Sequence, residues 1–237
     1  MCAALTSGAQ APPSIPTVDQ ILARYVEAIG GRTAIEKVTT RVMVGTWENE
    51  RARLVRPIAI YAKAPDKRVQ ILGLGEASQG FNGTTGWSLN MSENGLRELT
   101  GAGLAGARRQ AVFYGDLTLK ELYTTLTFAG RGKIGGHETY IVDASQAEGN
   151  IQKLHFDAQS GLLIRRDGIA TITKDGQSLT QVAVEMSLED YRAVDGINLP
   201  FTIRQKFAGP AGTISIKFRD IKHNVPIDDE TFAVPEP

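Results

Sequence analysis

Three histidines have the side chains best suited to acid–base or metal chemistry, because imidazole titrates near neutral pH. His137 lies in a Gly-Gly-His-Glu turn, His155 lies in a predicted strand, and His223 follows another strand. No two of them have the short spacing of a metal-ligand pair. The acidic triplet at 228–230 is typical of the first turn of a short helix. The sequence therefore predicts neither a metal site nor a catalytic residue.

A glycine-rich segment at 101–106 reads GAGLAG and matches the nucleotide-binding pattern G-x-G-x-x-G. A dinucleotide site also needs a buried parallel strand before the glycines and an acidic residue about 20 positions after them. The preceding strand, at 96–99, is short and polar, and no strand–helix–strand unit follows. We interpret the glycines as the start of a helix made of small residues, and we expect no cofactor.

Aromatic side chains gather in the first half of the sequence, in predicted strands and in a helical insertion. They are compatible with an ordinary core, and also with the wall of a pocket for an acyl chain, because ligand cavities are mostly apolar. We predict that aromatic and leucine side chains line such a cavity. The predicted cavity residues are Trp47, Tyr61, Phe81, Trp87, Leu104, Phe113, Leu119 and Leu122.

The elements that would position these residues begin with a helix at about 17–29. Thr17 and Gln20 form a capping box at its start. Apolar side chains then recur at helical spacing along its length, which predicts that one face of the helix lies on the rest of the protein. Gly30, followed by a second glycine, ends the helix.

A short helix capped by Thr33 and Glu36 follows, and beyond it the apolar pattern changes to the period of two that is typical of strands. The predicted strands of the first half lie at 41–50, 54–64, 67–74, 76–82, 86–90 and 96–99. Pro57 predicts an edge or a bulge in the second of them. Residues 101–123 then have the pattern of a helical insertion. The strands predicted after it lie at about 126–134, 138–145, 151–157, 162–173, 178–193, 199–208 and 212–222.

Sequential hairpins of this kind predict an antiparallel meander, and a sheet of about eleven or twelve strands must curl. Its concave face needs a cover, which the helices at 17–37 and 101–123 can supply. We therefore predict a mainly β (α+β) fold. One curved antiparallel sheet forms an unclosed half-barrel, covered by an N-terminal helix and a central helical insertion. Residues 17–237 form a single domain, because no linker or change of composition interrupts them.

Composition and charge exclude several functions. The chain has 237 residues with 26 basic and 26 acidic side chains, so it has no basic field for a nucleic acid. No apolar run approaches the roughly 18 residues of a membrane helix, so we expect peripheral membrane contact or none. Residues 1–16 read as a disordered tail or the remnant of a signal peptide, with a small-x-small cleavage site at 7–9. We therefore expect a periplasmic or secreted protein.

Four segments carry a resemblance to a known family: TVDQILARY at 17–25, the glycine pair at 30–31, LHFDAQSGLL at 154–163 and EDYRAVDGINLP at 189–200. Together with the order of helix, strands, helical insertion and strands, they resemble the LolA-like superfamily of periplasmic lipoprotein carriers and outer-membrane lipoprotein-sorting proteins. The resemblance covers residues 17–234. It implies an unclosed β-barrel whose helices form a lid over a hydrophobic cavity for lipid or acyl groups. It also implies an arginine on the sheet that ties the lid shut, for which the candidates are Arg41, Arg53, Arg56 and Arg68.

Competing functions remain open at this point. The first is an exported, non-enzymatic and monomeric binding protein that holds a lipid or the acyl chain of an acylated protein. The second is an exported accessory or sensor domain that binds an envelope protein through its sheet edge. The first needs an open cavity under residues 101–123, whereas the second needs a filled cavity and an exposed apolar patch elsewhere. An enzyme with an unrecognised site is a third reading, which needs clustered titratable groups with shifted pKa values in a cleft.

Overall fold

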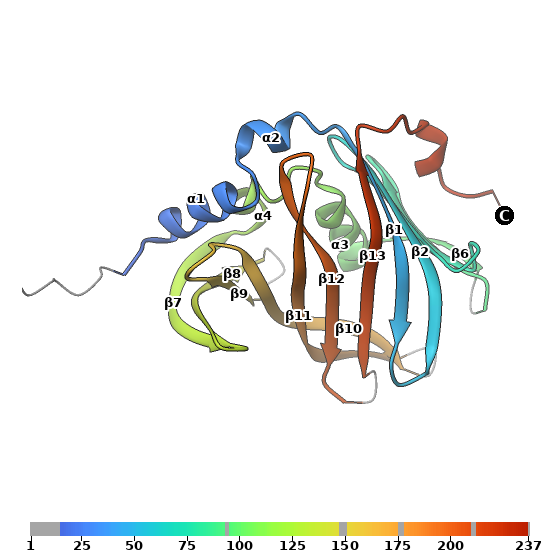
Figure 1. The fold of residues 1–237 in the computed structure, drawn as a ribbon. Helices are drawn as coiled ribbons and strands as arrows, with labels where there is room; N and C mark the ends of the chain where they lie inside the picture. Colours follow the sequence, from blue (N-terminus) through green and yellow to red (C-terminus); the bar gives the residue numbers. More distant parts are fainter. Residues whose placement is uncertain (1–14, 93–94, 147–150, 175–177, 210–211, 237) are drawn as a thin grey trace, which may run out of the picture.

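The computed structural model describes residues 15–92, 95–146, 151–174, 178–209 and 212–236. These residues form one curved antiparallel sheet of 13 strands with helices on its concave side (Figure 1). The strands of the first half are β1 (Thr40–Asn49), β2 (Leu54–Lys63), β3 (Lys67–Leu72), β4 (Ala77–Asn82), β5 (Gly86–Asn90) and β6 (Gly95–Glu98). Those of the second half are β7 (Thr125–Ile134), β8 (His137–Ser145), β9 (Ile151–Asp157), β10 (Leu163–Lys174), β11 (Ser178–Val194), β12 (Ile197–Phe207) and β13 (Thr213–His223).

The helices are α1 (Val18–Ala28), α2 (Arg32–Glu36), α3 (Gly101–Ala111), α4 (Leu119–Leu122) and the short 3-10 helix η1 (Asp229–Phe232). The last confirms the short final helix predicted from the acidic triplet. The α1 capping box is confirmed as well, because Thr17 accepts from the Gln20 backbone N–H and Gln20 accepts in return. None of the helices in the described ranges is long and apolar enough to cross a membrane.

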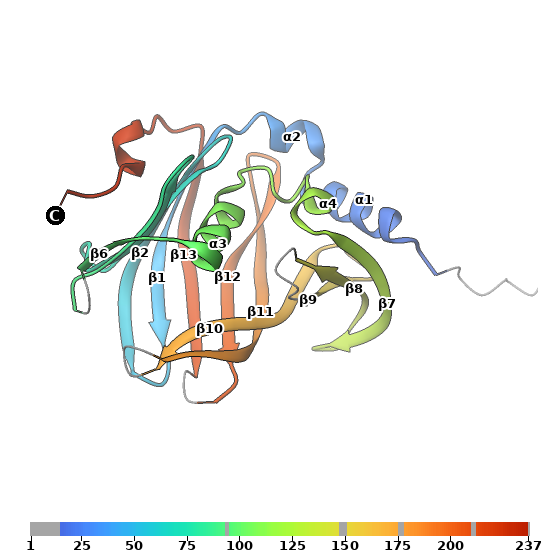
Figure 2. The ribbon, with the colours of Figure 1, turned by 180° about the vertical axis from the view of Figure 1, so that it is seen from behind.

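The order of the strands explains why helices cover the sheet. It runs β6-β5-β4-β3-β2-β1-β13-β12-β11-β10-β9-β8-β7, so the first and last strands of the chain pair in the middle. Strands β6 and β7 are consecutive in sequence but lie at opposite edges. The chain between them must therefore cross the sheet, and α3 and α4 lie on this crossing (Figure 2). The predicted half-barrel with its helical insertion is confirmed.

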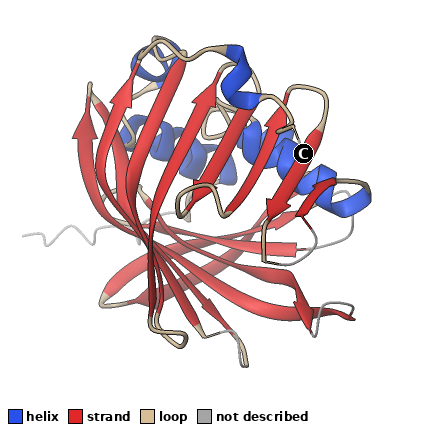
Figure 3. Ribbon diagram, turned by 90° about the vertical axis from the view of Figure 1, so that its right-hand side faces the viewer, coloured by secondary structure: helices blue, strands red, loops and turns tan. Residues whose placement is uncertain are grey.

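Helices α1, α3 and α4 lie inside the curve of the sheet, whereas η1 packs against its other face (Figure 3). Helix α1 contacts β7, and α3 contacts β3, β4 and β5. Ile21 and Tyr25 of α1 face the sheet and are each 3% exposed. The apolar stripe seen in the sequence is thus the docked face of the helix, and its burial stabilises the fold by roughly 25 cal/mol per Å² of apolar surface.

Two local predictions were wrong. Helix α2 has no side-chain cap, because its N-cap residue is Gly31, and Glu36 pairs with Arg32 at 2.9 Å instead of completing a capping box. Strand β2 lies inside the sheet between β1 and β3, so Pro57 does not mark an edge. Its ring is tolerated because the β2–β3 pairing begins only at Ile58, and the missing N–H leaves no gap in that ladder.

Buried apolar side chains form three clusters. The main cluster lies between α1 and the concave face of the sheet, and it includes Tyr25, Phe156 and Phe218. The second contains Val69, Trp87 and Phe232, with Tyr61 at its border. In strand β2, Ile60 belongs to the main cluster and Tyr61 borders the second. Adjacent residues of a strand point to opposite faces, so the two clusters lie on opposite faces of the sheet. The third lies under α3 and joins Phe81 to two helical alanines.

Candidate functional site

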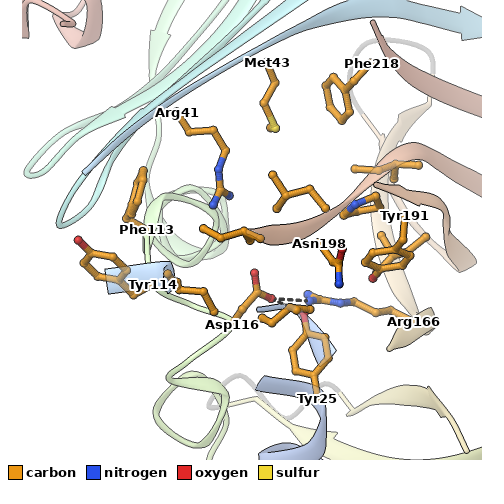
Figure 4. Close-up of a pocket in the computed structure, with 17 residues that line it drawn as sticks. Tyr25, Arg41, Met43, Phe113, Tyr114, Asp116, Arg166, Tyr191, Asn198 and Phe218 are labelled. Carbon is orange, nitrogen blue, oxygen red and sulfur yellow. Dashed lines mark hydrogen bonds and ion pairs between the residues drawn. The ribbon is translucent and has the colours of Figure 1, made fainter. Parts of the chain in front are cut away.

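A cavity of about 180 Å³ lies between α1, the chain that follows α3, and the concave face of the sheet (Figure 4). Most of its wall is apolar and comes from elements far apart in the sequence. The apolar lining is Ile29, Ile35, Met43, Phe113, Leu188, Ile197, Leu199, Pro200, Ile203 and Phe218. The cavity therefore resembles the mostly apolar sites that proteins use for small ligands.

Three charged side chains, Arg41, Asp116 and Arg166, also line this apolar cavity. Asp116 lies between the two arginines in Figure 4. Its Oδ1 is 4.0 Å from an Nη atom of Arg166, which is an ion pair without a hydrogen bond. Both guanidinium groups stay charged at neutral pH because arginine holds its proton even when it is buried. The lining thus carries two positive charges and one negative charge.

Arg41 reaches the cavity from β1. Its Nε donates to Nε2 of His223 at 3.2 Å, and its guanidinium lies 5.4 Å from the ring centroid of Phe113, a cation–π contact. Burial lowers the pKa of Arg41, and the negative charge of Asp116 offsets part of that effect. Burial, and then the charge of Arg41, also lower the pKa of His223, whose Nδ1 lies 3.1 Å from Asp195. Neutral His223 can therefore accept from Arg41 while it donates to Asp195.

Arg166 reaches the cavity from β10. Its Nε is buried and has no hydrogen-bond partner among the described residues. A buried N–H without a partner is costly, and such groups in native proteins often mark a place where something else binds. Arg166 is therefore the polar side chain of the cavity with the clearest unused hydrogen-bonding capacity.

The other polar side chains of the cavity already have partners. Tyr25 donates its hydroxyl proton to Asp116 at 2.7 Å, and Tyr191 donates to the Leu163 carbonyl oxygen at 2.7 Å. Burial, and then the charge of Asp116, raise the pKa of Tyr25 well above its usual value, so the phenol keeps its proton. Asn198 donates from Nδ2 to the Ala28 carbonyl oxygen at 2.7 Å and fixes the end of α1.

The eight residues predicted from the sequence do not meet in one place. Phe113 lines the cavity. Trp47, Leu119 and Leu122 belong to or border the main cluster, but they lie outside the cavity lining. Phe81 and Leu104 pack together in the cluster under α3, and Tyr61 and Trp87 lie on the opposite face of the sheet. Phe113 is thus the one of the eight that lines this cavity, and the role of all eight in ligand binding stays a prediction.

The four arginines considered for tying the lid differ in their surroundings. Arg41 contacts Phe113, in the chain between α3 and α4. Arg68 is a half-buried side chain that donates to Gln70, and desolvation lowers its pKa to about 10. Arg53 is exposed, and Arg56 pairs with Glu76 on the surface. Among the four, Arg41 therefore has the position that the resemblance implies.

The histidines are not isolated, although the sequence suggested this. Each one pairs with an aspartate: His137 with Asp157 at 2.8 Å, His155 with Asp167 at 2.9 Å, and His223 with Asp195 at 3.1 Å. Burial lowers the pKa of His155. No group of three or more metal-ligating side chains gathers in the part of the chain that the structure describes.

Two shallower hollows adjoin α4. One, of about 370 Å³, is lined by Arg108, Leu122 and neighbouring residues between α3 and α4. The other, of about 220 Å³, lies between Val18 of α1 and Leu126 of β7. Both are more open to solvent than the cavity under α1, so they bury less of a ligand.

Comparison with solved structures identifies the fold. A protein of the DUF1329 family from Desulfovibrio piger matches with a TM-score of 0.64 and 12% identity, covering 92% of this chain and 98% of that one. A LolA superfamily protein from Nitrosomonas europaea matches with a TM-score of 0.59 and 15% identity, over 92% and 98% of the two chains. A domain from Vibrio parahaemolyticus matches with a TM-score of 0.58 and 11% identity, covering 89% of this chain and 97% of that one. It is provisionally assigned as an outer membrane lipoprotein-sorting protein domain. The chain therefore has a LolA-like fold, as predicted. The sequence itself matches no protein-family model and no curated protein.

Proposed function

We propose that the protein is an exported, non-enzymatic binding protein that holds a lipid or lipoprotein acyl chain in the cavity under α1. The observation that carries this proposal is the cavity itself: about 180 Å³ of space remains inside an apolar wall where a packed core would be filled. The LolA-like fold supports it, because two of the matching structures are named for the LolA superfamily and for lipoprotein sorting. The same likeness supports a location in the bacterial envelope.

The size of the cavity limits what it holds in this conformation. An engineered apolar cavity of about 150 Å³ takes up benzene, which has six carbons. A cavity of about 180 Å³ therefore accommodates a short acyl chain or the end of a longer one. A full-length chain requires the covering helices to move, in keeping with a lid.

A cavity-filling substitution tests this function. Met43→Trp places a larger side chain in the cavity, and Leu89→Trp adds the same side chain beside the second cluster on the opposite face. We expect a fluorescent fatty-acid probe to bind the wild type and Leu89→Trp with similar affinity, and Met43→Trp at least about ten-fold more weakly. Mass spectrometry of organic extracts from the native protein would then identify the natural ligand.

The proposal fails if no acyl probe binds the wild type at a concentration of 100 μM. A dissociation constant of that size corresponds to a binding free energy of about −5.5 kcal/mol. It also fails if both tryptophan variants bind as well as the wild type while they stay folded, because the probe would then sit elsewhere. Melting curves of the three proteins show whether a loss of binding reflects unfolding.

A protein-binding accessory domain is the second candidate. The observation that favours it is a set of exposed apolar side chains at the ends of neighbouring strands: Val55 at 60%, Leu74 at 94% and Met91 at 72% exposure. A hydrogen bond from the Gly73 N–H to the Pro57 carbonyl oxygen joins the ends of β2 and β3. A second, from the Met91 N–H to the Glu76 carbonyl oxygen, joins the ends of β4 and β5. Leu74→Ser with Met91→Ser would abolish co-purification of an envelope partner and leave acyl-probe binding unchanged.

A further inference from the structure

We infer that the ligand of this cavity carries a single carboxylate, which the guanidinium groups of Arg41 and Arg166 bind while its hydrocarbon chain lies against the apolar wall. This inference rests on the proposed function and adds the chemical class of the ligand to it. Its evidence is the set of charged and polar groups in the lining, which a neutral hydrocarbon chain would not need.

The charges of the lining leave one positive charge unbalanced. Arg41 and Arg166 contribute two positive charges, and Asp116 contributes one negative charge. His223 lies behind Arg41 and is neutral, and its partner Asp195 is 67% exposed, so water screens that carboxylate. The side chains of Arg166 and Asp116 are 31% and 41% exposed, so water solvates the unbalanced charge only in part and it still costs free energy. A monoanionic ligand would neutralise the cavity, whereas a neutral lipid would leave the cost in place and a dianionic phosphate would reverse its sign.

The hydrogen-bond donors point to the same group. Tyr25, Tyr191 and Asn198 each give a proton to a protein oxygen, so they offer the ligand little. The Nε atom of Arg166 is buried without a partner among the described residues. Guanidinium donors form a planar fork that matches the two oxygens of a carboxylate. An alcohol or an ester would accept fewer of these bonds.

The two arginines also fix the direction of the chain. In Figure 4 Asp116 and Arg166 lie together on one side of the cavity, Met43 and Phe218 lie on the other, and the guanidinium of Arg41 lies between them. A carboxylate held by Arg166 therefore directs its hydrocarbon chain past Arg41 toward Met43 and Phe218. The cavity volume suits about six to eight carbons, by comparison with the benzene cavity above. A straight-chain acid of eight carbons is accordingly the probe of choice.

Four probes of equal chain length test the inference by titration calorimetry at pH 7.5: octanoic acid, octan-1-ol, methyl octanoate and octyl phosphate. The free acid is ionised at this pH, because carboxyl groups titrate near pH 4 to 5. We expect octanoate to bind at least about ten-fold more tightly than the alcohol or the ester, the range of a charge-assisted hydrogen bond. Octyl phosphate should bind more weakly than octanoate.

Arginine variants locate the effect. Arg166→Met keeps an apolar side chain of similar length, and it should lower octanoate affinity about ten-fold while octanol affinity stays unchanged. Arg41→Met should act in the same direction. Arg68→Met is the matched control, since Arg68 is also a half-buried arginine on the sheet but lies outside the cavity lining. It should leave the preference for the acid intact.

A second measurement uses the wild-type protein alone, so its result does not depend on whether a variant folds. The pH titration of the carboxyl signal of [1-13C]octanoate, followed by NMR with protein in excess, reports the pKa of the bound acid. Contact with arginines should lower it by at least about one unit below that of the free acid, whereas an apolar site would raise it. A raised or unshifted value overturns the inference.

The outcomes separate the inference from the function on which it rests. If octanoate and octanol bind equally well, the cavity holds an acyl chain but does not recognise a carboxylate, so the inference is wrong and the function stands. Tighter binding of octyl phosphate assigns a different headgroup and also overturns the inference. If none of the four probes binds and longer fatty acids do not bind either, both are wrong.

Discussion

Asp157 shows how one carboxylate can hold a turn and dock a helix. Its side chain is 4% exposed, and its Oδ1 accepts from the backbone N–H groups of Gln159 and Ser160 at 3.0 and 2.6 Å. Its Oδ2 lies 2.8 Å from Nδ1 of His137. Burial alone would raise the pKa of Asp157, but the hydrogen bonds from Ser160 and His137 hold it below its usual value. The turn that it shapes presents the Gln159 carbonyl oxygen to Arg24 of α1 at 2.6 Å.

We predict that Asp157→Ala lowers the free energy of unfolding by about 2–3 kcal/mol at pH 7, because several bonds to an ionised carboxylate are lost. Since the folded-state pKa lies below the unfolded value of 3.8, this stabilisation is present above pH 3.8 and disappears as the pH falls through the folded-state pKa. The difference between the two proteins should therefore shrink below about pH 4. Urea denaturation between pH 7 and pH 3 measures it.

Asp143→Ala is the control for this change. Asp143 also pairs with a basic side chain, Lys153 at 2.9 Å, but on the surface of the sheet. Exposed pairs contribute at most about 1 kcal/mol. If the loss in Asp157→Ala is no larger, or if it does not depend on pH, then the hydrogen bonds of Asp157 do not hold the turn.

Single residues of the cavity were only partly predictable from the sequence. Arg41 shares a face of β1 with Met43, so strand alternation alone would have placed its charge among apolar side chains. Arg166 could not be found in this way. The β10 ladder shifts between Leu163 and Arg165, which brings Leu163 and Arg166 to the same face although they are three residues apart.

At the scale of elements, Gly30 joins the end of α1 to the β11–β12 turn. It adopts a φ of 117°, and a Cβ atom there would lie 2.2 Å from the Gly196 carbonyl oxygen. The approach is close because the N–H of Asn198 donates to the Ile29 carbonyl oxygen at 3.0 Å. Position 30 therefore needs glycine both for its backbone angle and for its lack of a side chain.

We predict that Gly30→Ala lowers the free energy of unfolding by about 3 kcal/mol or more, since strain and a backbone clash add together. Gly130→Ala separates these two causes: its φ is 126°, but a Cβ atom there would meet nothing within 4 Å. It should cost only about 1–2 kcal/mol. Chemical denaturation gives both values. Equal losses would mean that α1 can shift away from the turn at little cost.

The sequence predicts the helices and strands more reliably than it predicts the face of the sheet on which each side chain lies. The helices and most strands follow from local signals, such as the capping box of α1 and the alternation along β12. The side of the sheet on which a strand residue lies depends on curvature and on distant partners. Trp87 illustrates this, because it is buried by Phe232 of η1, at the end of the chain, rather than by α1 or α3. No local pattern in the first half of the sequence indicates that contact.

At the scale of the whole molecule, the chain that crosses the sheet closes the cavity. Residues 112–118, here called the lid segment, join α3 to α4 and contribute Phe113, Tyr114 and Asp116 to the cavity wall. Three long-range hydrogen bonds hold the segment down. The Phe113 N–H donates to Pro65 at 2.9 Å, the Tyr114 hydroxyl donates to Val38 at 3.0 Å, and Asp116 accepts from Tyr25.

These contacts connect the segment to α1 and to the chain at the ends of β1 and β2. Pro65 follows β2, Val38 precedes β1, and Tyr25 belongs to α1. Opening the cavity at the lid segment must break all three bonds, but it need not break the ladder between β1 and β13. The free energy of such local opening is lower than that of global unfolding. The lid segment is thus the part of the wall that can move while the sheet stays intact.

We predict that Tyr114→Phe makes the lid segment open more often, because the variant loses the bond to the Val38 carbonyl oxygen. A loss of about 1 kcal/mol corresponds to a roughly five-fold change in the opening equilibrium. Hydrogen exchange of the amides at 115–118 should quicken by that factor, and a bound acyl probe should dissociate about five-fold faster. Exchange in β12 and β13 should stay as in the wild type.

Tyr191→Phe provides the matched control for the lid prediction. It removes another cavity hydroxyl, but that hydroxyl bonds to Leu163 within the sheet, so exchange in the lid segment should not change. If Tyr114→Phe leaves exchange and probe release unaltered, or if Tyr191→Phe alters them equally, the ligand does not enter past the lid segment. The remaining boundary of the cavity is then α1, which would have to leave its docked position and expose Ile21 and Tyr25 to water. That movement would cost far more apolar burial than a hinge at residues 112–118, so release would be slow and strongly temperature-dependent.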